Sequence, residues 1–146
     1  AATLAWSGDV IYYSVWGGYP NLQFVFPEGG ALIWVDNMMI PATAANPVGA
    51  LQVMDWVYQP EIAQMITEWV FYMSPCAGVQ DGIAAHAEEE RAAGKTGLAD
   101  KLAATAANEN LFPSDALLQR TRFRHYVRSD EEAAEFDSIF LPISQG

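Results

Sequence analysis

Cysteine and long apolar runs are both scarce in this sequence. Its 146 residues include a single cysteine, Cys76, so no disulfide can form within the chain and no cysteine-based metal cluster can exist. No stretch approaches the roughly 20 apolar residues that a membrane-spanning helix needs. The chain starts at Ala1, without a methionine and without the basic and apolar segments of a secretory signal. We therefore expect a mature or excised piece of a longer protein.

Positive charge is scarce as well. Lys and Arg total seven against 18 Asp and Glu, which gives a formal net charge of −11. Nucleic-acid binding depends on clustered Lys and Arg that neutralise phosphates, so this balance argues against a nucleic-acid partner. A strongly acidic chain instead raises the local concentration of cationic solutes.

The few basic residues are concentrated near the end of the chain. Arg120, Arg122, Arg124 and Arg128 lie within nine positions, and the first three alternate along the sequence. One interpretation is a basic patch. The favoured interpretation is an exposed, extended segment whose guanidinium groups pair with acidic side chains.

Local signatures of catalysis are missing too. The sequence has no G-x-S-x-G, Walker-type, H-E-x-x-H or glycine-rich dinucleotide motif, and its only histidines are His86 and His125. His86 has helical spacing to two nearby glutamates but no further metal ligand. Glu28 and Asp36 could pair in a carboxylate-based hydrolase only by proximity, without a visible acid/base partner. We expect a protein that is not an enzyme, with no catalytic residue, metal or cofactor.

Aromatic residues, by contrast, are plentiful. The chain has five Trp, six Tyr and seven Phe, and 51% of its residues are hydrophobic. One domain of this length can bury a substantial core, and surplus aromatic side chains often line binding clefts. Core and cleft remain open alternatives at this point.

The pattern of apolar residues predicts strands followed by helices. The first third is rich in β-branched and aromatic residues divided by turn-forming residues, which predicts strands over residues 3–6, 10–14, 22–26 and 31–35. Asn46-Pro47 is a helix-start signal, and Pro60 restarts the pattern. The expected helices cover residues 48–58, 60–70, 82–93 and 98–107, followed by a last helix that starts at a capping box of Ser129 and Glu132.

Trp34 and Asp36 form the most informative pair in the chain. If residues 31–35 continue as an extended segment, side chains two positions apart point to the same side. An indole face beside a carboxylate suits a small organic cation, through cation–π attraction and charge-assisted hydrogen bonds. The alternative is a core Trp34 followed by an Asp36 that serves a turn or a helix cap.

Several short segments are informative through their order and spacing. They are Ala5-Trp6-Ser7-Gly8-Asp9, Pro27-Glu28-Gly29-Gly30, Ile33-Trp34-Val35-Asp36, Ile40-Pro41, Asn46-Pro47 with Ala50-Leu51, Val57-Tyr58-Gln59-Pro60-Glu61-Ile62-Ala63 and Phe71-Tyr72-Met73-Ser74-Pro75. Together they resemble one protein family, the spermidine/putrescine-binding proteins of bacterial ABC importers. The resemblance is close over much of residues 1–80, weaker over 108–140, and interrupted by a divergent or inserted stretch at 82–107.

This resemblance implies an α/β fold of the type II periplasmic-binding-protein class, a two-lobed receptor that closes like a hinge. The chain would be the C-terminal half of that fold. Residues 1–34 and 81–146 would belong to one lobe, and residues 35–80 would contribute to the other. The implied location is periplasmic, or extracellular with a membrane anchor. The implied partners are a small-molecule solute, the membrane permease of an ABC importer and the N-terminal half of the receptor.

The resemblance also assigns ligand-binding roles. Trp6 and Trp34 match aromatic walls, Asp36 matches the carboxylate that engages a ligand amine, and Tyr72 matches a tyrosine of the cleft. A polar glutamine of the family falls near Arg124 or His125 here. The resemblance implies a polyamine as the ligand. Because a fixed guanidinium at Arg124 in the cleft would repel a polyamine, either the alignment shifts there or the ligand is another solute, such as a sugar, an amino acid or a carboxylate-bearing compound.

Overall fold

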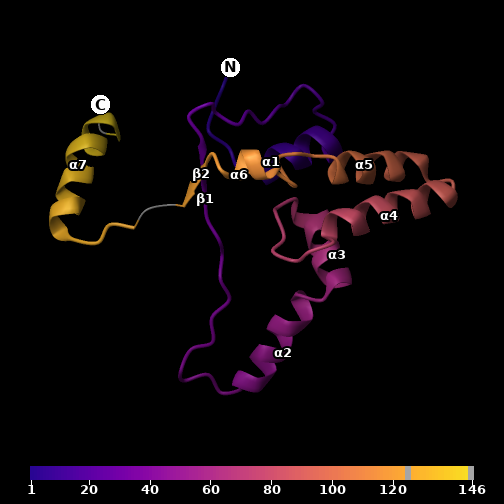
Figure 1. Ribbon diagram of the computed structural model, residues 1–146, viewed down its shortest axis with the longest axis horizontal. Helices are drawn as coiled ribbons and strands as arrows, with labels where there is room; N and C mark the ends of the chain where they lie inside the picture. Colours follow the sequence, from indigo (N-terminus) through magenta and orange to yellow (C-terminus); the bar gives the residue numbers. More distant parts are fainter. Residues whose placement is uncertain (124–125, 145–146) are drawn as a thin grey trace.

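Helices account for most of the regular structure. The computed structural model describes residues 1–123 and 126–144 (Figure 1). In chain order the elements are α1 (Ser7–Ile11), a π-helical turn η1 (Tyr12–Trp16), β1 (Ala31–Ile33), α2 (Pro47–Val57), α3 (Pro60–Val70), α4 (Val79–Ala92), α5 (Thr96–Ala106), α6 (Asp115–Leu118), β2 (Thr121–Phe123) and α7 (Asp130–Ser144).

The main core lies between α3, α4 and α5. Helices α4 and α5 run side by side after a sharp turn at Gly94, whose φ of 79° favours glycine (Figure 1). Alanine is frequent in these helices and lets their backbones pack closely, so their stability depends on packing against each other. The buried members of this cluster are Ala63, Val79, Ile83, Ala87, Leu102 and Ala106.

A smaller cluster joins the beginning of the chain to this core. It consists of Ile11, Phe71 and Leu111, with Trp16 packed against both clusters. The Trp16 indole N–H donates to the Thr105 hydroxyl oxygen at 3.2 Å. Trp16 therefore fixes η1 against α5.

The strand predictions for the first third of the chain are mostly wrong. Residues 10–14 are helical, in α1 and η1, because this conformation places Ile11 and Trp16 against the core, and packing overrides β propensity. Residues 3–6 and 22–26 form no regular element. An extended segment becomes a strand only when a neighbouring chain satisfies its backbone groups, and these two segments have no strand beside them in the described structure.

One strand prediction is confirmed in part. β1 covers Ala31–Ile33 and pairs in parallel with β2, with Leu32 opposite Arg122. Gly30 lies directly before β1 with a φ of 99°, and a side chain there would clash with the Arg120 carbonyl oxygen. The glycine thus permits the close approach of the two segments.

Among the described residues, Arg120 and Arg122 form hydrogen bonds with backbone carbonyls in place of the expected ion pairs with carboxylates. Arg120 donates to the Pro27 carbonyl oxygen at 2.6 Å, and its guanidinium lies 5.1 Å from the centroid of the Phe26 ring. Arg122 donates to the backbone carbonyls of Gln119 and Thr121. Both guanidinium groups donate to backbone carbonyl oxygens that lie near them. These hydrogen bonds stabilise the local backbone conformation.

The helix predictions are largely confirmed. The Asn46 side chain accepts a hydrogen bond from the Gly49 N–H at 2.9 Å and caps α2. The Ser129 hydroxyl accepts from the Glu132 N–H at 3.2 Å and starts α7. α4 begins at Val79, three residues before the predicted start, because Val79 is itself buried in the core.

Helices α2 and α7 project away from the packed centre (Figure 1). The molecule exposes 11161 Å² of surface, whereas a compact monomer of 16.0 kDa should expose about 7,400 Å². Along the described part of the chain, no helix combines the length and the hydropathy needed to cross a bilayer. Many apolar side chains of α2 and α7 are exposed, among them Trp56 and Ile143.

Candidate functional site: an aromatic and acidic wall at the start of α1

Trp6 and Trp34 lie against each other. Their ring centroids are 4.5 Å apart and the ring planes meet at 61°, an edge-to-face arrangement. Such pairs stabilise a structure by about 0.5–1.5 kcal/mol beyond the area they bury. Trp6 is the N-cap residue of α1 and Trp34 directly follows β1. The fold thus brings together two tryptophans that are far apart in sequence.

Both indoles remain open to solvent. Trp6 is 56% exposed and Trp34 is 41% exposed, so neither is a core residue. This exposure removes the alternative in which Trp34 merely fills the core. Both rings therefore keep surface that a ligand can reach.

Asp36 lies on the exposed segment that follows Trp34. β1 ends at Ile33, so Trp34 and Asp36 do not lie in a strand. The prediction that their side chains point to the same side because they are two positions apart in a strand therefore no longer applies. The neighbouring Asn37 amide donates to the Val35 carbonyl oxygen at 3.1 Å and shapes the chain here. The Asp36 carboxylate is solvent-facing, close in sequence to the indole pair.

Tyr72 packs against the first turn of α1. A β-carbon added at Gly8 would lie 2.5–2.8 Å from three atoms of the Tyr72 ring, so only glycine leaves room for the ring there. Burial raises the pKa of the Tyr72 phenol, and the charge of Asp9 and a hydrogen bond to its carboxylate raise it further. The neutral phenol is therefore held as a donor toward Asp9.

Asp9 is the site residue that sequence reasoning missed. It belongs to the Ala-Trp-Ser-Gly-Asp segment that carried the resemblance, but only Trp6 received a role there. The available signal was only its place in that segment, three residues after Trp6. Asp9 lies in the first turn of α1, against which the Tyr72 ring packs, and Trp6 is the N-cap residue of the same helix.

The remaining predicted residues stand as follows. Arg124 and His125 lie outside the described residues. His86 does not simply face solvent, because its Nδ1 lies 3.0 Å from a Glu68 carboxylate oxygen of α3 and its Nε2 lies 3.8 Å from Glu90. Over residues 1–123 and 126–144, no group of three or more His, Cys, Asp or Glu is placed to hold a metal ion.

The arrangement suits an organic cation. Aromatic faces attract a positively charged group with about 0.5–2 kcal/mol each, depending on how far it is desolvated. Carboxylates such as Asp36 and Asp9 accept charge-assisted hydrogen bonds from ammonium groups. A tyrosine hydroxyl adds a polar contact. Groups of these kinds can bind and orient a cationic solute.

Comparison with known proteins points in the same direction. Residues 3–115 match the model of a family described as bacterial extracellular solute-binding protein. The spermidine/putrescine-binding periplasmic proteins of Salmonella typhimurium and Escherichia coli are 32% and 31% identical to the chain over 72 residues. A norspermidine sensor from Vibrio cholerae is 29% identical over 72 residues.

These matches are partial. The aligned segment covers 49% of this chain and 20% of each of these three relatives. The chain therefore matches about a fifth of the length of these curated proteins. No solved structure matches it.

Proposed function

The chain belongs to the bacterial extracellular solute-binding proteins, and from this membership we propose that it captures polyamines such as putrescine or spermidine for an ABC importer. Members of this family are binding proteins rather than enzymes. The names of the relatives support the choice of ligand, and so does the acidic charge of the chain. The single observation that carries the proposal is the contact between the exposed Trp6 and Trp34 rings.

In the proposed site the methylene chain of the ligand lies along the indole faces of Trp6 and Trp34. One ammonium group donates to the Asp36 carboxylate, and the Tyr72 hydroxyl lines the same cleft. Exclusion of water strengthens each of these electrostatic contacts, because the effective dielectric constant falls. In this proposal the side chains of the protein bind the ligand without a cofactor.

We propose further that the chain is the C-terminal half of a two-lobed, type II receptor. Residues 1–34 and 81–146 would form part of one lobe, and residues 35–80 would contribute to the other. The parallel pairing of β1 with β2 supports the first grouping, since one strand comes from each segment. The large exposed surface supports the presence of further packing partners, including an N-terminal half of the receptor.

The proposed location is extracytoplasmic, either periplasmic or anchored outside the cell. The relatives named periplasmic and the family description support this location. The proposed partner is the membrane permease of an ABC importer, to which the receptor delivers its ligand. Ligand-driven closure of the lobes would then require that the closed form binds the polyamine more tightly than the open form.

Replacement of the Asp36 carboxylate tests the proposed ligand role. In the full-length protein, Asp36→Asn should weaken spermidine binding tenfold or more, because a hydrogen bond to a charged group contributes about 1.5–3 kcal/mol. Isothermal titration calorimetry measures the change. Asp55→Asn, which alters the charge equally on the exposed surface of α2, should leave the affinity unchanged.

Two outcomes would contradict this assignment. An unchanged spermidine affinity in Asp36→Asn would remove Asp36 from the site. Equal losses of spermidine affinity in Asp36→Asn and Asp55→Asn would mean that Asp36 acts only through the net charge of the protein. A parallel thermal-shift panel of putrescine, spermidine, sugars and amino acids identifies the ligand class, and stabilisation by a sugar alone would overturn the choice of a polyamine.

A further inference from the structure

Phe71 has a backbone conformation that is unusual for its residue type. It ends α3 in the left-handed region, with a φ of 60° and a ψ of 30°. Within residues 1–123 and 126–144, no other non-glycine residue has a positive φ. In this region a β-carbon is crowded by the following carbonyl oxygen, so helices that end this way usually place glycine there. Phe71 is therefore strained, and its surroundings must hold it in place.

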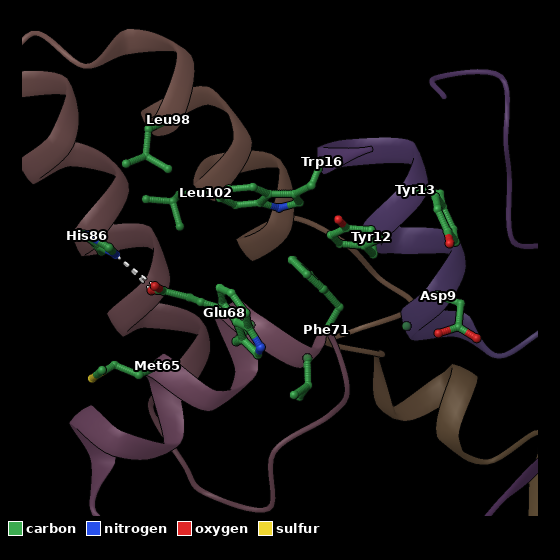
Figure 2. Close-up of a pocket in the computed structure, with 13 residues that line it drawn as sticks. Asp9, Tyr12, Tyr13, Trp16, Met65, Glu68, Phe71, His86, Leu98 and Leu102 are labelled. Atoms are coloured by element: carbon green, nitrogen blue, oxygen red, sulfur yellow. Dashed lines mark hydrogen bonds and ion pairs between the residues drawn. The ribbon is translucent and has the colours of Figure 1, made fainter. Parts of the chain in front are cut away.

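The buried ring of Phe71 keeps the residue in this conformation. Only 4% of the residue is exposed, and it packs in one cluster with Ile11 and Leu111. Figure 2 shows its ring directed toward Tyr12 and Trp16, whose ring centroids lie 5.7 and 5.8 Å from that of Phe71. Burial of an aromatic ring stabilises a fold by more than a single left-handed residue costs, so this packing maintains the strained turn.

Phe71 and its neighbour Tyr72 contact α1 at two places. Phe71 packs in the cluster that contains Ile11, the last residue of the helix. The Tyr72 ring covers Gly8 in the first turn. Trp6 is the N-cap residue of the same helix. The two contacts therefore fix the position of Tyr72 relative to the start of α1, where Trp6 lies.

The turn at Phe71 decides where the Tyr72 ring lies. An ordinary helical φ is about −63°, so the φ of Phe71 differs from it by a rotation of about 120° around the N–Cα bond. A rotation of this size redirects the chain that follows, including Tyr72. A helical conformation at Phe71 would extend α3 and carry the Tyr72 ring away from Gly8.

We propose that Phe71 is a positioning residue of the polyamine site, because its buried ring holds the left-handed turn that places Tyr72 against α1. Phe71 is itself buried, so it acts through Tyr72 and does not touch the solute. The effect on binding rests on the proposed function, in which the Tyr72 hydroxyl lines the cleft. The action of Phe71 on Tyr72 is present without a ligand and can be tested separately.

Phe71→Leu and Phe71→Ile form a matched pair for this test in the full-length protein. Both new side chains are apolar and have the same number of atoms, but only isoleucine is branched at the β-carbon, which excludes the left-handed region most strongly. Phe71→Ile should therefore lower the Tyr72 pKa toward its ordinary value, because the ring leaves its partly buried place beside Asp9. Phe71→Leu should keep the Tyr72 pKa raised. Phenolate absorbance measures both, corrected by subtracting Tyr72→Phe in each background.

Spermidine binding to the same two variants tests the consequence for the site. Calorimetry should show about a tenfold loss of affinity in Phe71→Ile, because the ligand loses a hydrogen bond to the tyrosine hydroxyl. The affinity of Phe71→Leu should stay within twofold of the unsubstituted protein. Ile83→Val, which trims a buried side chain of the main core, controls for a loss of packing alone and should change neither the Tyr72 pKa nor the affinity.

Three results would overturn the proposal. They are an equal Tyr72 pKa in Phe71→Leu and Phe71→Ile, an equally lowered Tyr72 pKa in Ile83→Val, and a lowered Tyr72 pKa in Phe71→Ile with unchanged spermidine affinity. If the unsubstituted protein does not bind spermidine, the proposed function fails, whereas the Tyr72 titration still decides whether Phe71 positions Tyr72.

Circular dichroism checks that each variant is folded. If Phe71→Ile does not fold, Phe71→Gly and Phe71→Ala replace the pair. Both lose the ring, but only glycine adopts the left-handed turn without strain. The Tyr72 pKa should then be higher in Phe71→Gly than in Phe71→Ala, and equal values would contradict the role of the turn.

Discussion

Tyr72, a residue of the proposed cleft, is coupled electrostatically to Asp9. The Tyr72 pKa lies above its ordinary value of 10.0, first because the ring is partly buried and then because of the Asp9 charge and hydrogen bond. The raised pKa belongs to the folded state, so the interaction stabilises the fold fully below about pH 10 and is lost as the pH rises through the Tyr72 pKa.

Asp9→Asn should therefore lower the Tyr72 pKa without restoring the ordinary value, since the effect of burial remains. A titration of phenolate absorbance, corrected by subtracting a Tyr72→Phe variant, follows this single tyrosine. Asp55→Asn serves as the control and should not change the Tyr72 titration. A Tyr72 that ionises at its ordinary pKa in the unsubstituted protein contradicts the coupling to Asp9.

The sequence anticipated part of this site and missed part of it. Trp6, Trp34 and Tyr72 were identified through their resemblance to a family pattern, and the structure places two of them in contact and the third against the same helix. Asp9 was missed because a carboxylate at a helix start has an ordinary explanation in the helix dipole. The proximity of Asp9 to the cleft becomes visible only from the packing of Tyr72 over Gly8, a contact between segments that are distant in sequence.

At the scale of elements, the stability of α2 depends on its cap. None of its residues is buried, so tertiary packing contributes little to its stability. Asn46→Ala removes the acceptor for the Gly49 N–H and should destabilise α2 by about 1 kcal/mol. Hydrogen exchange of the amides of residues 48–57 measures this loss as faster exchange.

Gln52→Ala is the matched control, because it lies in the same helix, away from the cap. Alanine has the higher helix propensity, so exchange in this variant should be unchanged or slower. Equal acceleration of exchange in both variants would mean that the cap does not hold α2. The remaining helices should keep their protection in either case.

Helices were predictable from the sequence and strands were not, for a physical reason. The start signals at Asn46, Pro60 and Ser129 act within one turn, so they can be recognised from neighbouring residues alone. The conformation of residues 10–14 depends on the contact of Ile11 with Phe71, which no local pattern encodes. The pairing of β1 with β2 also joins distant segments, and so only β1 was foreseen as a strand.

At the scale of the whole molecule, apolar surface points outward from three helices. Trp56 of α2, Trp69 of α3 and Ile143 of α7 are all more than half exposed. Composition could show that the chain contains enough apolar residues for a core. It could not show that many of them stay exposed in this chain, which depends on how the helices meet in space. The proposed two-lobed receptor gives these faces their packing partners.

The most direct test of the polyamine site is an NMR titration that follows the indole N–H signals of Trp6 and Trp34. In isotope-labelled full-length protein, the NMR signals of the Trp6 and Trp34 indole N–H groups are followed as spermidine is added. Both signals should shift together and saturate with one dissociation constant, and Asp36→Asn should suppress both shifts. Indole signals that stay fixed while spermidine binds, or that shift equally with a neutral sugar, would contradict a cation held between Trp6, Trp34 and Asp36.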